Sequence, residues 1–260
     1  MAARMSTPGC PSGVARPRPC VKKSWTPPAP SQGWPGMPEN PWSEVDKYIT
    51  DLLVRPDAAL DAALADGAAA GLPPISVAPN QGKLLHLIAR IQGARDILEI
   101  GTLVGYSTIW LARALPDGGR VVTLEADPKH AAIARANFAR AGVNEKVVIW
   151  LGRALDTLPQ VAQERSRPFD LIFIDADKAG IPEYFTWALK LSRVGTVIIV
   201  DNVVRNGAVI DAASEDPSIK GVRRFNEMLA SEPRVSATAI QTVGSKGYDG
   251  FTVVLVTKRP

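Results

Sequence analysis

Two apolar segments, each ending abruptly in acidic and amide side chains, constrain this chain more than any other feature. Phe173 and Ile174 run into Asp175, and a second apolar run ends at Asp201 and Asn202. Apolar runs of this kind, separated by a helix-like stretch, are typical of buried parallel strands. Ligands of open α/β sheets bind just beyond the carboxyl ends of such strands. Adjacent strands would bring these oxygen donors together, so the sequence predicts a divalent-metal site in a cleft.

The chain after Trp42 alternates between strand-like and helix-like segments. We expect strands at 95–100, 120–125, 146–151, 169–174 and 194–200, with helices at 105–114, 128–141, 154–163 and 180–191 between them. Helices at 43–53 (with Ser43 as N-cap), 57–70 and 80–92 come first, and 235–243 with 251–257 form a terminal hairpin with a long loop. This order predicts an α/β fold with a doubly wound, mostly parallel sheet, to which the hairpin adds an antiparallel edge.

Composition separates the first 41 residues from the rest of the chain. At 260 residues and 46% hydrophobic content, the chain can bury one large core. Residues 1–41 hold ten of the 22 prolines, both cysteines and a charge of +4, which equals the net charge of the whole chain. The remainder is therefore balanced, and the pI near 9.1 gives little support to nucleic-acid binding.

We expect residues 1–41 to form a disordered Pro-rich tail ahead of one domain over 42–260. The tail lacks the apolar core of a secretory signal, and a translation start at Met37 is an alternative interpretation of it. No apolar run approaches the ~20 residues that span a membrane. A domain without cysteine fits a reducing, cytoplasmic location.

A glycine-containing turn from Glu99 to Ser107 follows the first strand of the alternation. Junctions of strand, turn and helix bind nucleotide-type ligands. Leu103 occupies the position where the dinucleotide fingerprint needs a second glycine, and Glu99 would repel a pyrophosphate. The loop therefore suits a nucleoside that carries an amino acid better than a phosphate-bearing cofactor. An ordinary tight turn is the alternative interpretation.

A further acid, Glu125, ends the next strand, 24 residues beyond Gly101. A carboxylate at this place can bind both ribose hydroxyls of a nucleoside. Alternatively, Glu125 is only a neighbour of the helix start at Asp127. Ala154, after the third strand, falls where an adenine would lie against a small residue.

In this order, the motifs resemble those of the cation-dependent O-methyltransferases, the group that includes caffeoyl-CoA and catechol O-methyltransferases. The matching segments are Glu99-Ile100-Gly101, Gly105-Tyr106-Ser107, Ile174-Asp175-Ala176-Asp177-Lys178, Asp201-Asn202 and Asn206-Gly207. The resemblance covers about residues 42–258. It implies S-adenosylmethionine as methyl donor, a Rossmann-like sheet of seven strands, a small catechol-like or phenolic acceptor and a homodimer.

The resemblance also implies a role for each matching residue. The metal ligands are matched by Asp175, Asp201 and Asn202, the catalytic base by Lys178 beside Asp175, and a substrate-facing position by Asn206. Donor-binding positions are matched by Val77, Glu99, Gly101, Thr102, Ser107, Glu125 and Ala154, and the donor or acceptor pocket by Asp177 and Tyr184. Arg205 departs from the pattern, because plant relatives that act on phenylpropanoid thioesters carry Trp there.

The chemistry of methyl transfer agrees with this set. A neutral phenol is a poor nucleophile, and a divalent cation chelated by two adjacent hydroxyls would stabilise and orient the phenolate. Carboxylate and amide ligands with open positions suit Mg²⁺, with Mn²⁺ or Ca²⁺ as alternatives. A cation beside Lys178 would lower the pKa of that lysine towards a usable base. Lys178 as a solvated residue or partner of Asp177, and Asp201-Asn202 as a turn, remain alternatives.

Two other functions belong to different classes. The first is a nucleotide-binding, NAD-type oxidoreductase, against which Leu103 and the metal-type carboxylates argue. The second is a non-catalytic dimeric binding module of the same fold. The presence of Asp175, Asp201 and Lys178 makes this second function a poor fit.

Overall fold

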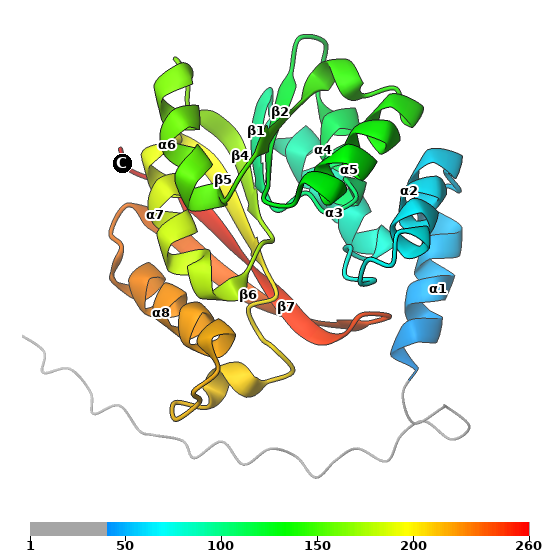
Figure 1. Ribbon diagram of the computed structural model, residues 1–260. Coiled ribbons are helices and arrows are strands. Elements are labelled where there is room, and N and C mark those ends of the chain that lie inside the picture. The colour runs from blue at the N-terminus through cyan, green and yellow to red at the C-terminus, as the bar shows by residue number, and fades with distance from the viewer. Residues whose placement is uncertain (1–40, 260) are drawn as a thin grey trace, which may run out of the picture. The chain divides into compact units, whose positions relative to one another are not determined.

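The computed structural model describes residues 41–259, which fold around a seven-stranded sheet (Figure 1). Its strands are β1 (Asp96–Ile100), β2 (Arg120–Glu125), β3 (Val147–Leu151), β4 (Phe169–Ile174), β5 (Ser192–Asp201), β6 (Val235–Gly244) and β7 (Gly247–Val256). Their spatial order is β3-β2-β1-β4-β5-β7-β6. The first five strands are parallel, and β7 pairs antiparallel with β5 and β6. The predicted fold class is confirmed.

Helices cover both faces of this sheet (Figure 1). The N-terminal group consists of α1 (Trp42–Leu53), α2 (Ala58–Ala69), α3 (Pro79–Gln92), α4 (Tyr106–Ala114) and α5 (Pro128–Arg140). The other group consists of α6 (Ala154–Glu164), α7 (Ile181–Lys190) and α8 (Pro217–Ser231), and short 3₁₀ turns are η1 (Asn144–Lys146), η2 (Lys178–Gly180) and η3 (Ala208–Ile210). Helices α2 to α5 share one apolar core with the sheet, and α6 to α8 share the second.

The central strands read as continuous apolar runs because both of their faces are buried. Along β4, Leu171 and Phe173 pack into the core under α2 to α5, whereas Ile172 and Ile174 pack into the core under α6 to α8. All four side chains are fully buried. The period of two between the faces is that of an extended strand, and it fixes which residues emerge at its carboxyl end.

Two local expectations need correction, and one helix was not predicted. The terminal hairpin has a short turn instead of a long loop, because β7 already begins at Gly247 and pairs with β6 from there. Helix α1 begins at Trp42 with Pro41 in the N-cap position, so Ser43 is not its cap. The amphipathic helix α8 was not assigned from the sequence. In contrast, Asp57 caps α2 by accepting hydrogen bonds from the next helical amides.

The predicted N-terminal tail lies outside the described residues, apart from Pro41. Its expected disorder therefore stays a prediction. Within residues 41–259, no helix combines the length and the apolar character needed to cross a bilayer.

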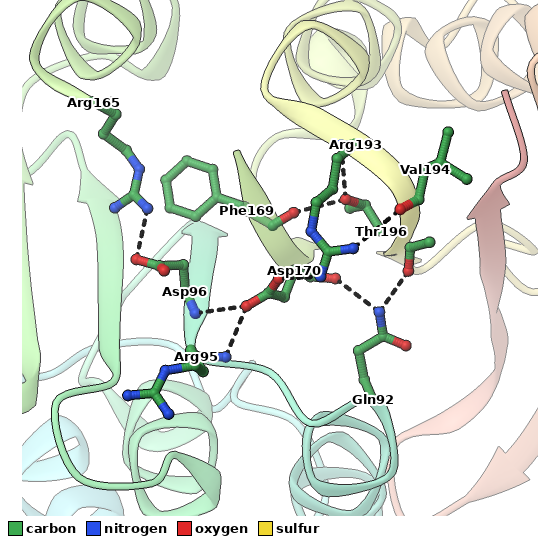
Figure 2. A network of polar contacts seen from close by, with 10 residues as sticks. Gln92, Arg95, Asp96, Arg165, Phe169, Asp170, Arg193, Val194 and Thr196 are labelled. Carbon is green, nitrogen blue, oxygen red and sulfur yellow. Dashed lines mark hydrogen bonds and ion pairs between the residues drawn. The ribbon is translucent and has the colours of Figure 1, made fainter. Parts of the chain in front are cut away.

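A polar network joins the starts of three parallel strands, at the end of the sheet opposite their carboxyl ends (Figure 2). Asp170 of β4 accepts hydrogen bonds from the amides of Arg95 (2.8 Å) and Asp96 (3.0 Å), and from the guanidinium of Arg193 (2.6 Å). Burial opposes ionisation of Asp170, yet these hydrogen bonds hold its pKa below the ordinary value. The network fixes the relative position of β1, β4 and β5, and therefore of the residues at their other ends.

Candidate functional site

A cleft of about 930 Å³ opens at the carboxyl ends of β1, β2, β4 and β5. Of the residues singled out in the sequence, it brings together Val77, Gly101, Thr102, Ser107, Glu125, Ala154, Asp175, Asp177, Lys178, Tyr184 and Asn202. Three do not line it: Glu99, Asp201 and Asn206. The first two are buried beneath it, and Asn206 is exposed. Binding crevices of open α/β sheets lie at this place.

The turn after β1 is shaped by Glu125 from the end of β2. One oxygen of this carboxylate accepts hydrogen bonds from the amides of Thr102 (3.2 Å) and Leu103 (2.8 Å). Leu103 has a positive φ of 51°, which is unusual for a residue with a branched side chain. The second oxygen accepts the amide of Asp127 at 2.9 Å. Glu125 therefore both lines the cleft and holds the turn that forms one of its walls.

Gly101 is required at this turn for two reasons. Its φ of +103° lies in the region that side chains disfavour. In addition, a Cβ atom there would lie 2.3 Å from the carbonyl oxygen of Asp175, at the end of β4. The glycine turn and the segment carrying Asp175 are thus in direct backbone contact.

Glu99 lies under the turn and is fully buried. Its carboxylate accepts hydrogen bonds from the hydroxyls of Ser107 (2.6 Å), Thr108 (2.5 Å) and Thr123 (2.7 Å). Burial raises the pKa of Glu99 to about 7, a shift that the three hydroxyls oppose and the nearby charge of Asp175 increases. Glu99 therefore meets the cleft only indirectly, through Ser107.

The raised pKa of Glu99 makes a pH dependence of stability testable. An acid whose pKa is raised by folding stabilises the fold fully below its ordinary pKa of 4.5, and this contribution is lost as the pH rises through about 7. Between about pH 5 and about pH 8, Glu99→Gln is expected to gain about 3 kcal/mol of unfolding free energy relative to the wild type. Urea unfolding at both pH values measures this, and an unchanged difference between the two proteins would contradict it.

On the far side of the cleft, Asp177 and Tyr184 form a hydrogen-bonded pair. The Tyr184 hydroxyl donates to one oxygen of Asp177 at 2.5 Å, and the amide of Gly180 donates to the other at 2.9 Å. Burial, followed by the Asp177 carboxylate, raises the pKa of Tyr184 above its usual range. His130 also lines the cleft, with Nδ1 3.4 Å from Glu125.

The acidic end of the cleft is built by neighbouring strands, as the sequence predicts. Ile174 of β4 pairs with Val200 of β5, so the following residues, Asp175 and Asp201, emerge side by side. Lys178 donates to Asp175 (2.7 Å), and the Asn202 amide donates to Asp201 (2.8 Å). Asn202 adopts a left-handed φ of 58°. Two carboxylates therefore lie close together beside one ammonium group, and Asn202 follows them at the same edge of the cleft.

Asp201 is the most buried member of this group, with 5% of its surface exposed. Burial, reinforced by the charge of Asp175, raises the pKa of Asp201 to about 7. Its second oxygen accepts a hydrogen bond from the side-chain amide of Gln81 at 2.7 Å. Gln81 belongs to α3 and lies 120 positions away in the chain, so no sequence pattern could have indicated this contact. Within residues 41–259, no group of three or more His, Cys, Asp or Glu side chains forms a metal cage.

The segment from residue 59 to residue 256 matches the family model described as O-methyltransferase. The chain belongs to the O-methyltransferase family. This methyltransferase is 55% identical over 215 residues to a catechol O-methyltransferase of Niastella koreensis, with 83% of this chain and 97% of that relative covered. It is 52% identical over 222 residues to a catechol O-methyltransferase of Mycobacterium tuberculosis, with coverages of 85% and 99%.

Solved structures give the same result. The methyltransferase superposes with a TM-score of 0.82 on an O-methyltransferase from Bacillus cereus in complex with SAH, at 62% identity and coverages of 83% and 98%. Its TM-score is 0.83 against TomG from Streptomyces achromogenes in complex with SAM, at 55% identity and coverages of 85% and 100%. The predicted family, enzyme class and fold are confirmed. Neither the oxidoreductase nor the non-catalytic module finds support in these relatives.

Proposed function

We propose that this methyltransferase transfers the methyl group of S-adenosylmethionine to a hydroxyl of a small catechol-like acceptor held by a divalent cation. One observation carries the proposal: the nucleoside-type turn after β1 and the oxygen donors after β4 and β5 open into the same cleft. The glycine turn even contacts the backbone of Asp175. A donor on the turn and an acceptor at the carboxylates would therefore meet in one cavity, as direct transfer requires.

The donor half of the cleft suits a nucleoside joined to an amino acid. Glu125 and His130 line this half and bring polar groups to the place of the ribose hydroxyls, and the small side chain of Ala154 lies where the adenine would be. Ser107 lines the cleft beside the glycine turn, where the methionine part would lie. Val77 and Asp177 close the cleft on either side. Dinucleotide folds use the acid after the second strand for the same ribose contact.

The acceptor half fits a hard divalent cation. Asp175, Asp201 and Asn202 would hold it, because carboxylate and amide oxygens suit Mg²⁺, Mn²⁺ or Ca²⁺ and no thiolate lies among the described residues. The charges of this donor set fit such a cation. Two carboxylates face only one ammonium group, so an added positive charge would be favourable there. When bound, the cation would supply Lewis-acid stabilisation of an ionised acceptor hydroxyl.

Lys178 is the residue placed to accept the acceptor proton. Its side chain is largely buried, and its Nζ atom lies 2.7 Å from Asp175, so the lysine is held at the edge of the oxygen-donor group. Helix α8 keeps the backbone there in place, because Gly221 packs directly against the carbonyl of Lys178. This step requires Lys178 as the free amine. The proton of the acceptor hydroxyl would then pass to Nζ while the methyl group moves from the sulfonium sulfur of the donor to the acceptor oxygen.

Removing divalent cations tests the proposed function. Purified protein with S-adenosylmethionine and catechol is expected to form the methyl ether with added Mg²⁺, and EDTA is expected to lower kcat/KM about a hundredfold or more. Readdition of Mg²⁺ or Mn²⁺ in excess should restore the rate. Product formation that EDTA leaves undiminished would remove the cation from the mechanism.

We further propose a homodimer in a reducing, cytoplasmic location. Helix α1 contacts both α3 and the edge strand β6, and these elements expose apolar side chains: Val45, Tyr48, Leu52, Leu87, Ile91 and Ile240. Exposed apolar side chains on neighbouring elements, beside a strand at the edge of a sheet, are typical of a protein interface. The lack of cysteine in the described residues fits a reducing compartment. Sedimentation equilibrium at micromolar concentration is expected to give the mass of a dimer. A monomer mass would contradict the proposed homodimer.

A further inference from the structure

An arginine that the sequence marked only as a departure from the family pattern lines the acceptor half of the cleft. Arg205 follows the metal-type residue Asn202 by three positions, and both line the cleft. Among the residues that the structure describes, its guanidinium has no ion-pair or hydrogen-bond partner. Its backbone is held instead: the amide donates to Asp249 at 3.0 Å, and the carbonyl accepts the amide of Ala208 at 3.0 Å. Asn206, for which the sequence predicts contact with substrate, lies outside the lining, and its amide donates to Tyr248.

The loop that carries Arg205 is strained. Arg205, Asn206 and Gly207 have consecutive positive φ values of 57°, 54° and 84°. Left-handed backbone costs a non-glycine residue about 1–2 kcal/mol, so the surrounding structure must impose it. Asp249 of β7 does so, because one of its oxygens accepts the amides of both Val204 and Arg205. Strained residues held in this way concentrate at functional sites.

The other positive groups near the acceptor are already engaged. Lys178 pairs with Asp175 at 2.7 Å, and the N-terminal amide of Ser218, the α8 residue in the cleft, is capped by Asp216 at 2.7 Å. Arg153 also lines the cleft, but it immediately precedes Ala154, on the donor half. Arg205 is therefore the guanidinium available to an anionic group on the acceptor.

We propose that Arg205 binds a carboxylate carried by the acceptor, so that the preferred substrates are catechol carboxylic acids. This inference rests on the proposed function and narrows its substrate class. A guanidinium offers a planar pair of donors that matches a carboxylate, and such charge-assisted pairs are strong. A neutral catechol would leave the arginine without this partner, and sites built for a polar group discriminate against ligands that lack it.

A carboxylate in this cleft has a second possible source, the methionine part of the donor. Ser107 lines the donor half beside the glycine turn, where the methionine part would lie, whereas Arg205 lies beyond Asn202 on the acceptor half. The two sources make different predictions for donor affinity. Binding of S-adenosylmethionine to Arg205→Gln, measured by calorimetry, is expected to equal that of the wild type.

The test compares protocatechuate, a catechol with one ring carboxylate, with its uncharged primary amide. With Mg²⁺ and S-adenosylmethionine, the wild type is expected to favour the acid in kcat/KM by about tenfold or more. Arg205→Gln should lose about tenfold to a hundredfold on the acid and less than about threefold on the amide, and Arg205→Lys should recover part of the loss. Arg135→Gln, which removes an exposed arginine of α5 outside the cleft, is the charge-matched control.

Four results would overturn the inference. One is equal kcat/KM of the wild type for the acid and the amide, and another is an equal loss of kcat/KM on both compounds in Arg205→Gln. Either result would show that Arg205 does not bind the carboxylate of the acceptor. A tenfold or greater loss of donor affinity in Arg205→Gln would assign the arginine to S-adenosylmethionine instead. Methylation of neither compound, despite intact donor binding, would overturn the proposed catechol function itself, and the inference with it.

Discussion

Asp201→Ala is expected to abolish methyl transfer while donor binding survives. Asp201 is buried at the end of β5 beside Asp175, and it lies outside the donor half of the cleft. Loss of its charge removes a proposed cation ligand, and Lewis-acid stabilisation is worth several kcal/mol, so kcat/KM should fall about a thousandfold or more. Initial rates with saturating Mg²⁺ measure the first effect, and calorimetry with S-adenosylmethionine measures the second.

Two further variants separate charge from packing at this position. Asp201→Asn keeps the size of the side chain and should lose most of the activity, because one ligand charge is gone. Gln81→Leu removes only the hydrogen bond that orients Asp201 and should weaken Mn²⁺ binding, followed by paramagnetic resonance, about tenfold. If donor affinity fell in parallel with activity in Asp201→Ala, the residue would belong to the donor site and its assignment as a metal ligand would be wrong.

The sequence was informative wherever function depends on strand ends. The continuous apolar run locates β4 from 169 to 174 without error, and the polar residues that follow must then emerge at the edge of the sheet. Asp175 and Asp201 were expected to meet for this reason, and they do. The match is best for buried parallel strands, because burial on both faces leaves little freedom in their sequences.

Contacts made across long stretches of chain were out of reach of the sequence. The hydrogen bond from Gln81 to Asp201 joins α3 to β5, and the loop carrying Arg205 is bent by Asp249 of β7. Neither pair shares a local motif, and each depends on how separate elements pack. The same holds for Glu99: its position at a strand end suggests a ligand contact, but three hydroxyls from its surroundings already occupy its carboxylate.

The residues with strained backbone also lie at the proposed site. Within residues 41–259, the non-glycine residues with positive φ are Leu103, Asn202, Arg205 and Asn206. The first belongs to the glycine turn of the donor half, and the other three follow β5 on the acceptor side. Strain of this kind persists only where the surrounding fold imposes it, and it concentrates at ligand sites. Among the described non-glycine residues, left-handed backbone is therefore confined to the two halves of the proposed site.

Gly101→Ala is expected to disturb both the donor half and the acceptor half of the cleft. The added Cβ would lie 2.3 Å from the carbonyl oxygen of Asp175, and the backbone φ of +103° already disfavours a side chain. Because the obstructing atom belongs to the backbone, the turn and the end of β4 must move apart. We expect a loss of about 3 kcal/mol in unfolding free energy, from strain and overpacking combined, and at least about tenfold weaker binding of S-adenosylmethionine.

Gly142→Ala provides the matched control for this effect. Gly142 also has a positive φ, +67°, but a Cβ there would meet nothing within 4 Å. This variant should lose only about 1 kcal/mol, the cost of left-handed backbone for alanine, and should bind donor and Mn²⁺ normally. Urea unfolding and calorimetry compare the two variants. If Gly101→Ala behaved like Gly142→Ala, the contact between the glycine turn and Asp175 would play no part in joining the donor and acceptor halves. A selective loss of donor and metal binding would instead show that this one backbone contact sets the distance between them.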